Sequence, residues 1–293
     1  MTNSLSFFKW RACLFVCLFV CAASAQALEP DRKVTYKTVG TVKLKLDVFN
    51  PQGLAPTDRR PAICFFFGGS WNNGKPAQFH QQARDLADLG MVAFAANYRV
   101  KRRNQTTPFE SVRDAKSAVR WIRQHAAELG VDPQRIVASG GSAGGHLAVC
   151  TAVIQGEEDK GEDLAISSVP DAVVAFNPVL DTTAKGFGLT SVGEDRQFDI
   201  SPCHQVRPGI PPTLVLHGTA DRIVPFENAE RFTRLMREAG NGCDLDAYEG
   251  QDHAFFNHRN YRKKIKDPKI YGQCMKTTVA FLASLGYIDR GGE

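Results

Sequence analysis

Short apolar runs alternate with amphipathic segments along most of this chain, and this alternation constrains its fold more than any other feature. Continuous apolar runs at residues 62–67 and 91–96 predict strands that are buried on both faces. Segments with helical spacing of apolar residues, such as 76–89 and 108–129, stand between and after them, and each ends at a glycine. Strands that alternate with helices imply a mainly parallel sheet covered on both faces. We therefore expect an α/β, doubly wound domain.

The remaining segments extend this pattern and add one edge of a different kind. Residues 34–39 and 42–49 alternate apolar and polar side chains, which predicts two half-buried strands paired antiparallel at the N-terminal edge. Residues 180–209 lack clear periodicity, and a loop of that length is usually functional or disordered. We expect a single domain over residues 28–293, with a cap-like insertion at 180–209. Further strands are expected at 135–138, 172–176, 213–217 and 244–248, and further helices at 144–153, 227–239 and 261–285.

The first segment has the layout of a secretory signal peptide. Positive residues precede an apolar run at 12–23, and small residues follow it, so we expect residues 1–27 to be removed after Ala25 or Ala27. A secreted or periplasmic protein would result. An uncleaved membrane anchor is an alternative, although the run is short for a bilayer. A lipoprotein attached at Cys21 is another, although the valine before that cysteine is large for a lipobox.

Charge and cysteine content limit the binding partners and the disulfides or metal sites that the chain can have. The net charge of +5 is scattered without a basic stripe, which argues against a nucleic-acid partner. Five cysteines follow the signal segment, and an odd number cannot pair completely. Cys64 and Cys150 lie in apolar segments and are expected to be buried thiols. Whether two of the remaining cysteines form a disulfide is left open; these are Cys203, Cys243 and Cys274. No CxxC pair or His/Cys cluster in the sequence indicates a metal site.

The segment Gly140-Gly141-Ser142-Ala143-Gly144 is a G-x-S-x-G sequence between a predicted strand and a predicted helix. A serine at this place must take a sharp, strained turn, which small neighbours allow. Its hydroxyl then stands exposed at the carboxyl edge of the sheet. An ordinary serine in a glycine-rich turn is the alternative, but the strand and helix around it favour Ser142 as a nucleophile.

A serine nucleophile needs a base and a group that orients the base. Asp221 and His253 both follow predicted strands, at the same sheet edge as the serine and in the chain order serine, acid, histidine. His146 lies in the helix after the nucleophile and is expected to face away, while His217 ends a buried strand and is expected to be structural. Asp252 is the rival acid, but it adjoins the base in sequence and cannot easily reach the far imidazole nitrogen.

Attack on an ester creates a negative oxygen that preorganised N–H donors can stabilise. The glycine-rich loop at 67–71 follows a buried strand, and its backbone amides at Gly69 and Ser70 are candidate donors. The amide of Ala143 would complete this oxyanion hole. A plain glycine turn is the alternative. Trp71 and Phe255 are candidate substrate contacts, with core packing as the alternative for each aromatic side chain.

These motifs resemble those of the α/β-hydrolase esterase/lipase group, in particular the bacterial branch of carbohydrate acetyl and feruloyl esterases (BD-FAE-like and acetyl xylan esterases). The resemblance covers nearly all of residues 28–293. It departs at Phe67, which replaces a motif histidine, and at Ser70, which replaces a glycine; the first change puts the rigidity of the loop in doubt. The family motifs H-G-G-G-W, G-x-S-A-G-G, H-G-x-x-D-x-x-V-P and G-x-x-H correspond to residues 67–71, 140–145, 217–225 and 250–253.

The resemblance implies a serine carboxylesterase that uses a Ser142–His253–Asp221 triad and an acyl-enzyme, with no cofactor and no metal. It implies short acyl groups, acetyl first, on plant or algal polysaccharides or small esters. A serine peptidase, a lipase for longer chains, and a catalytically silent binding protein are the alternatives. We expect no nucleic-acid partner and no stable membrane insertion after signal removal. The acyl group, the alcohol and the oligomeric state stay open.

Overall fold

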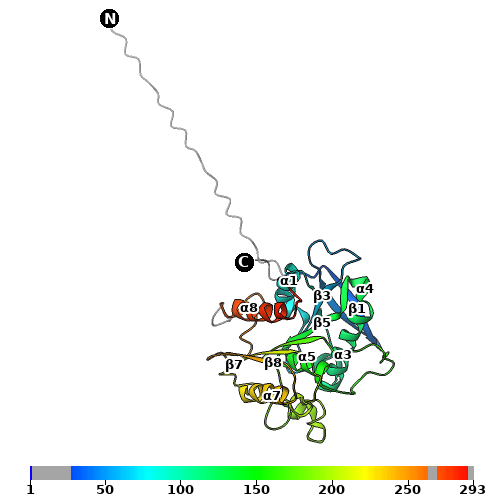
Figure 1. Cartoon of the computed structure of the whole chain (residues 1–293), viewed down its shortest axis with the longest axis vertical. Coiled ribbons are helices and arrows are strands. Elements are labelled where there is room, and N and C mark those ends of the chain that lie inside the picture. Colours follow the sequence, from blue (N-terminus) through cyan, green and yellow to red (C-terminus); the bar gives the residue numbers. More distant parts are fainter. Residues whose placement is uncertain (2–27, 263–268, 290–293) are drawn as a thin grey trace.

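The computed structural model describes Met1 and residues 28–262 and 269–289. The signal-peptide prediction concerns residues that lie outside this range, apart from Met1. Within it, one sheet of eight strands runs in the order β1-β2-β4-β3-β5-β6-β7-β8. The predicted α/β architecture is confirmed, and Figure 1 shows the sheet between two layers of helices.

The N-terminal edge of the sheet is antiparallel, and the rest is parallel. β1 pairs antiparallel with β2, and β2 pairs antiparallel with β4, whereas every later neighbour is parallel. The carboxyl ends of the parallel strands therefore share one edge. The strands are β1 Arg32–Val39, β2 Val42–Phe49, β3 Arg60–Phe66, β4 Val92–Ala96, β5 Val131–Gly141, β6 Ala172–Phe176, β7 Thr213–Gly218 and β8 Cys243–Tyr248.

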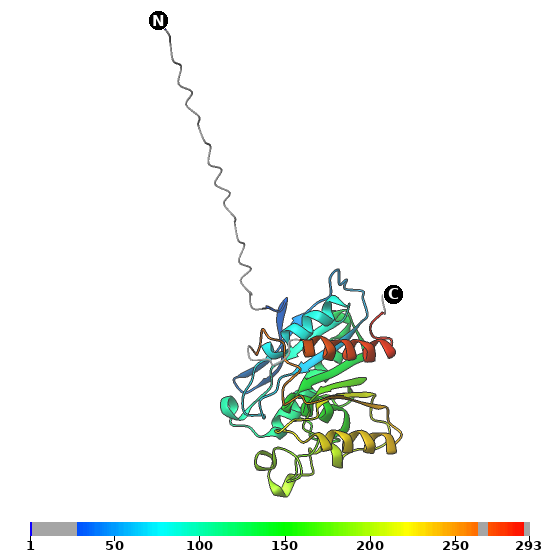
Figure 2. The same ribbon diagram turned by 90° about the vertical axis from the view of Figure 1, so that its left-hand side faces the viewer.

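Helices cover both faces of the sheet, as Figure 2 shows from the side. Helices α1 (His80–Asp88) and α8 (Lys269–Ser284) pack into one apolar cluster. Helices α3 (Pro108–Gln124), α5 (Ala143–Val153) and α7 (Phe226–Glu238) pack into the other. The buried strands between them contribute side chains to both clusters, which explains why their sequences are continuously apolar.

Several predicted boundaries differ from the structure for local reasons. The helix expected at 108–129 breaks at His125 into α3 and the short α4 (Ala126–Leu129), and Gly130 ends it in the left-handed conformation. The helix expected at 76–89 begins with a 3-10 turn, η1 (Pro76–Phe79). At the other end of the chain, residues 263–268 lie outside the described range, so the expected helix is seen as α8.

Residues 180–209 form a compact segment of short turns rather than an extended loop. The turns are α6 (Leu189–Val192), η2 (Glu194–Arg196) and η3 (Pro202–His204). The amide of Cys203 donates to the carbonyl of Leu180, which joins the two ends of the segment. Figure 2 shows this yellow-green segment beside α7, and its role as a cap stays a prediction.

The five described cysteines are all buried free thiols: Cys64, Cys150, Cys203, Cys243 and Cys274. The disulfide that the sequence allowed among Cys203, Cys243 and Cys274 is therefore not formed. Burial raises the pKa of the Cys203 and Cys274 thiols to about 12, so they remain protonated and unreactive at neutral pH.

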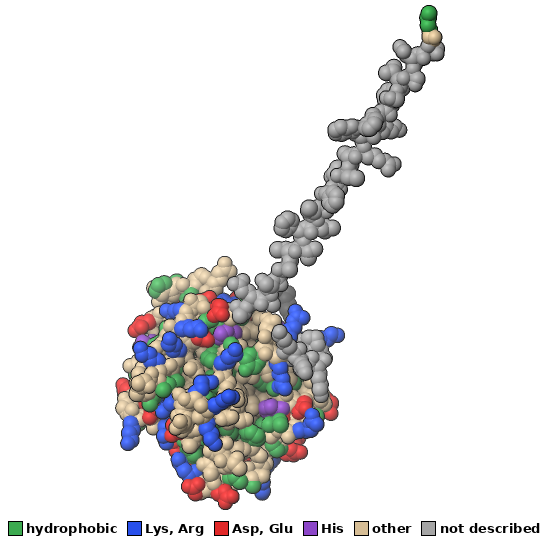
Figure 3. Space-filling model, turned by 180° about the vertical axis from the view of Figure 1, so that it is seen from behind, with side chains coloured by type: hydrophobic (Ala, Val, Ile, Leu, Met, Phe, Trp, Pro, Cys, Tyr) green, Lys and Arg blue, Asp and Glu red, His purple; other side chains and the backbone are tan. Residues whose placement is uncertain are grey.

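The surface carries charges of both signs. On the face that Figure 3 shows, Lys and Arg side chains are interspersed with Asp and Glu, in keeping with the scattered charge of the sequence. Within residues 28–262 and 269–289, no helix has the length and apolar character needed to cross a membrane.

Candidate active site

Ser142 occupies a sharp turn between β5 and α5. Its φ of 56° and ψ of −123° lie in a region that residues with a side chain rarely adopt. Glycines make room for this turn, because a Cβ on Gly140 would lie 2.6 Å from the carbonyl oxygen of Phe66. The amide of Ser142 donates to the carbonyl of Phe176 in β6, which fixes the turn to the neighbouring strand (2.9 Å).

The structure brings Ser142, His253 and Asp221 together. The Nε2 atom of His253 lies 2.9 Å from Oγ of Ser142, and its Nδ1 atom lies 2.7 Å from Oδ2 of Asp221. The three side chains come from segments that follow β5, β8 and β7, at the shared carboxyl edge of the sheet. This geometry allows the imidazole to accept a proton from the hydroxyl while the carboxylate orients it.

Four donors surround the carboxylate of Asp221. Its Oδ1 atom accepts hydrogen bonds from the amides of Ile223 and Val224, at 2.9 and 3.0 Å. Burial alone would raise the pKa of Asp221, but hydrogen bonds from His217 and His253 and from the backbone lower it well below its usual range. Asp221 is therefore ionised throughout the neutral range, as an orienting acid requires.

His217 has a more specific place than the sequence indicated. It is fully buried, and its Nε2 atom lies 3.3 Å from Oδ2 of Asp221 and 3.1 Å from the carbonyl oxygen of Val224. Both neighbours are acceptors, so the ring proton must reside on Nε2. His217 thus positions the acid, and the four-residue spacing between the two residues was the signal that sequence reasoning missed.

The other two candidates that the sequence analysis set aside, Asp252 and His146, bond to partners outside the triad side chains. Asp252 forms an ion pair with Arg222 at 2.7 Å, which lowers the pKa of its carboxyl, and it accepts the backbone amide of His253. His146 is buried, and its Nε2 atom lies 2.7 Å from the carbonyl oxygen of Ile200. Burial lowers the pKa of His146 to about 4, so this ring is neutral at pH 7.

The loop after β3 lies against the turn at Ser142. β3 and β5 are parallel neighbours, and a Cβ on Gly68 would lie 3.3 Å from Cβ of Ser142. Gly69 and Ser70 have φ values of 129° and 55°. Within the described part of the chain, the amides of Gly69, Ser70 and Ala143 donate to no protein acceptor. They are free to serve as oxyanion donors, and that role remains a proposal.

Trp71 and Phe255, the two predicted substrate contacts, are both buried, and their contact with substrate stays a prediction. The Trp71 side chain is 2% exposed and packs edge-on against His146. Phe255 is 7% exposed and packs against Tyr248. Both rings belong to apolar clusters, as the core-packing alternative predicts.

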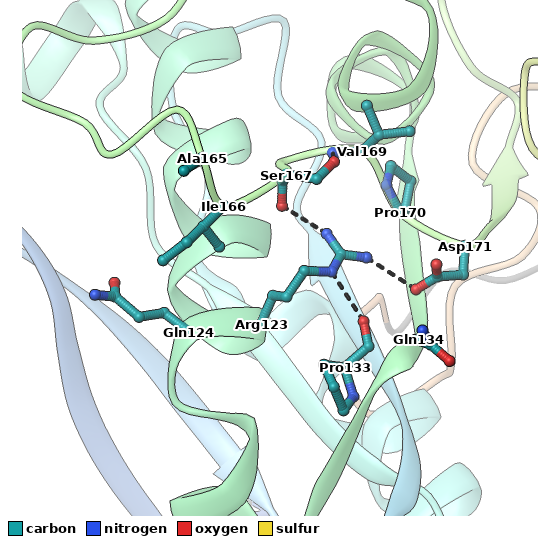
Figure 4. A pocket seen from close by; sticks show the side chains of 10 residues that line it. All are labelled: Arg123, Gln124, Pro133, Gln134, Ala165, Ile166, Ser167, Val169, Pro170 and Asp171. Atoms are coloured by element: carbon teal, nitrogen blue, oxygen red, sulfur yellow. Dashed lines mark hydrogen bonds and ion pairs between the residues drawn. The ribbon is translucent and has the colours of Figure 1, made fainter.

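A pocket of about 730 Å³ lies at the opposite edge of the sheet, where β6 begins. Figure 4 shows its one arginine, Arg123, bonded to the carbonyl oxygens of Pro133 and Ser167 and to Asp171. Because its guanidinium is used within the protein, the pocket offers a ligand no free cation there. It is remote from Ser142. The lining residues are Arg123, Gln124, Pro133, Gln134, Ala165, Ile166, Ser167, Val169, Pro170 and Asp171.

Comparison with known proteins assigns this chain to a family. The sequence model of the BD-FAE family matches residues 46–236, which include Ser142 and Asp221. The chain belongs to the BD-FAE family. His253 lies beyond the matched range, so its role here rests on its contacts with Ser142 and Asp221.

Relatives of this BD-FAE family member carry esterase names. It is 31% identical to the probable carboxylic ester hydrolase LipM and 33% identical to esterase LipQ, both from Mycobacterium tuberculosis, over 71% and 67% of this chain. It spans about half the length of these curated relatives (52% and 50%). The apo structure of Thermogutta terrifontis esterase 2 superposes with a TM-score of 0.83 at 46% identity, covering 88% of this chain and 96% of that one.

Proposed function

We propose that the protein is a serine carboxylesterase for short-chain acyl esters. One observation carries the proposal: His253 lies within hydrogen-bond distance of both Ser142 Oγ and Asp221 Oδ2 in a chain of the BD-FAE family. The esterase names of its relatives support the same reaction class.

In the proposed first step, Ser142 Oγ attacks the ester carbonyl while His253 Nε2 accepts the hydroxyl proton. The carbonyl π electrons move to oxygen, and the amides of Gly69, Ser70 and Ala143 donate hydrogen bonds to that oxyanion. The tetrahedral intermediate then collapses. The C–O bond to the alcohol breaks, and the alcohol leaves with the proton from His253.

In the proposed second step, water attacks the acyl-serine ester. His253 accepts a proton from that water and returns it to Ser142 Oγ as the new intermediate collapses. Asp221 holds the imidazole in one orientation and stabilises its cation throughout. The carboxylic acid is released, and the enzyme returns to its starting state.

The short-acyl preference rests on the structural neighbour and on the family resemblance. Structures of Thermogutta terrifontis esterase 2 at 44% identity carry bound propionate and butyrate. The narrower form of the proposal is that the substrates are acetyl esters on plant or algal polysaccharides; it is taken from the resemblance to carbohydrate esterases.

A p-nitrophenyl ester series from acetate to octanoate tests this specificity. A groove that binds longer acyl chains gains about 0.8 kcal/mol of binding free energy for each methylene that it buries. We expect kcat/KM to fall steeply from butyrate to octanoate instead. If octanoate equals or exceeds acetate, the lipase alternative replaces the short-acyl proposal; cleavage of a peptide p-nitroanilide at a comparable rate would favour the peptidase alternative.

We also propose export with cleavage after Ala25 or Ala27, on the strength of the apolar run at 12–23. Intact-mass measurement of the protein secreted by its host decides this. A mature chain that retains Met1 would contradict it.

A further inference from the structure

Buried amide side chains join the glycine-rich loop at 67–71, which we call the oxyanion loop, to the loop that carries His253. The amide of Gly68 donates to Oε1 of Gln78 at 2.7 Å. Nε2 of Gln78 donates to Oδ1 of Asn257 at 2.9 Å. Nδ2 of Asn257 in turn donates to the carbonyl oxygen of Ala254 at 2.9 Å. Three successive hydrogen bonds thus connect the two loops.

A fourth bond continues this connection to the sheet. The amide of Ala254 donates to Oδ1 of Asn177, the residue directly after β6 (3.0 Å). The side chains involved are buried, with exposed fractions of 7% for Gln78, 1% for Asn257 and 0% for Asn177. Hydrogen bonds in such surroundings are shielded from competing water. We call Gln78 and Asn257 the amide bridge.

The amide bridge can form in only one orientation. Gly68 presents an N–H at one end, and Ala254 presents a carbonyl oxygen at the other. The first requires the oxygen of Gln78, which leaves its NH₂ group to face Asn257. Asn257 must then turn its oxygen to Gln78 and its NH₂ group to Ala254. Both ends therefore specify the same arrangement.

The bridge ends beside backbone conformations that need support. Ser70, two residues after Gly68, has a φ of 55°, and Ala254, next to His253, has a φ of 67°. Residues with a Cβ rarely adopt such angles and keep them only where their surroundings enforce them. Strained residues thus lie at or near both ends of the bridge.

The bridge also bears on the departure at Phe67, where the family motif has histidine. The Phe67 ring stacks on Tyr98 at 4.0 Å between centroids and donates no hydrogen bond. The polar support of the adjacent Gly68 comes instead from Gln78.

We propose that Gln78 and Asn257 are positioning residues that hold the oxyanion donors and the base His253 in register. The proposal deepens the proposed function and rests on it. The esterase transition state needs both groups at once, because charge develops on the carbonyl oxygen while the hydroxyl proton moves to His253. Loosening one loop relative to the other should therefore lower kcat more than it changes KM.

The test compares Gln78→Met with a matched control, Gln82→Met. Gln82 lies four residues further along and is also buried, but the one hydrogen bond of its side chain in the described part of the chain is a 3.4 Å contact to the carbonyl oxygen of Phe256. We expect Gln78→Met to lower kcat for p-nitrophenyl acetate by roughly tenfold to a hundredfold. KM should stay within about threefold for both variants, and kcat within about threefold for Gln82→Met.

Asn257→Ala cuts the same bridge at its other side and provides a second variant if Gln78→Met fails to fold. The double variant should lose no more activity than the more impaired single variant, because both substitutions remove one connection. Equal kcat losses in Gln78→Met and Gln82→Met, wild-type kcat in Gln78→Met, or losses that multiply in the double variant would each overturn the proposal.

The rate at which a fluorophosphonate labels Ser142 separates this proposal from the proposed function. Labelling needs the activated serine but no ester substrate. Slower labelling of Gln78→Met than of Gln82→Met supports the bridge even if the wild type hydrolyses none of the esters offered. Equal labelling rates would overturn the bridge even if the wild type is an active esterase.

Discussion

At the scale of single residues, local sequence context indicates some site residues and conceals others. Ser142, Asp221 and His253 each stand in a recognisable motif after a predicted strand, so their convergence could be predicted. Gln78 lies in a segment that looks amphipathic and Asn257 in one without pattern. Only the tertiary fold shows that both are buried and bonded to each other.

His217 provides a residue-scale prediction about the acid. Its Nε2–H donates to Asp221 and Val224, and His217→Phe would remove both bonds. The lowered pKa of Asp221 means that its ionised form stabilises the fold at pH values above the unfolded pKa of about 3.9, and that this stabilisation is lost as the pH falls below it. We expect His217→Phe to destabilise the protein by about 1–3 kcal/mol at pH 7.

Urea unfolding at pH 7 and pH 3 measures this effect. The destabilisation should shrink at pH 3, because loss of the His217 donor brings the pKa of Asp221 in the variant closer to its usual range, and protonation of the carboxyl there relieves the missing hydrogen bond. Equal destabilisation at both pH values would show that His217 acts through the carbonyl of Val224 alone. A thermal-shift comparison with His217→Gln, which can retain a donor, serves as the control.

At the scale of elements, the periodicity of apolar residues predicts whether a segment is a helix or a strand better than it predicts where that element begins and ends. The buried strands and the paired first strands were predictable from apolar runs and alternation. The break at His125 and the early start of β5 at Val131 were not, because Gly130 ends α4 and the chain enters the sheet at once. The burial of Trp71 and Phe255 could not be predicted, because nearness to a motif does not show which way a ring points.

His146 connects α5 to the segment at 180–209, and its burial gives an element-scale prediction. Its pKa, lowered to about 4 by burial, lies below the unfolded value of about 6.5. The unfolded chain therefore binds more protons between these values, and stability falls as the pH drops from 6.5 to 4. His146→Gln removes this titration while keeping a possible donor to the carbonyl of Ile200.

Chemical denaturation at pH 7 and pH 4.5 compares the two proteins. The wild type should lose up to about 3 kcal/mol more stability than His146→Gln between these pH values, because its unfolded chain takes up a proton on this ring that the buried ring does not. An identical pH dependence in both proteins would show that His146 takes up its proton without cost in the folded state.

At the scale of the whole molecule, the sheet order decides where chemistry can occur. The parallel strands β3, β5, β6, β7 and β8 end at one edge, and the oxyanion loop, nucleophile, acid and base all follow strands that end there. The sequence predicted this edge through strand and helix alternation. It could not predict the packing of residues 180–209, because contacts such as Ile200 with His146 and Asp181 with Arg231 leave no periodic signal.

The central claim is that Ser142, activated by His253 and Asp221, carries the hydrolysis. The most direct measurement is kcat for p-nitrophenyl acetate in the wild type and in Ser142→Ala, with circular dichroism to confirm that both are folded. We predict a loss of roughly 10⁶-fold, the scale seen when a triad serine is removed. Turnover by folded Ser142→Ala within tenfold of the wild type would contradict the account.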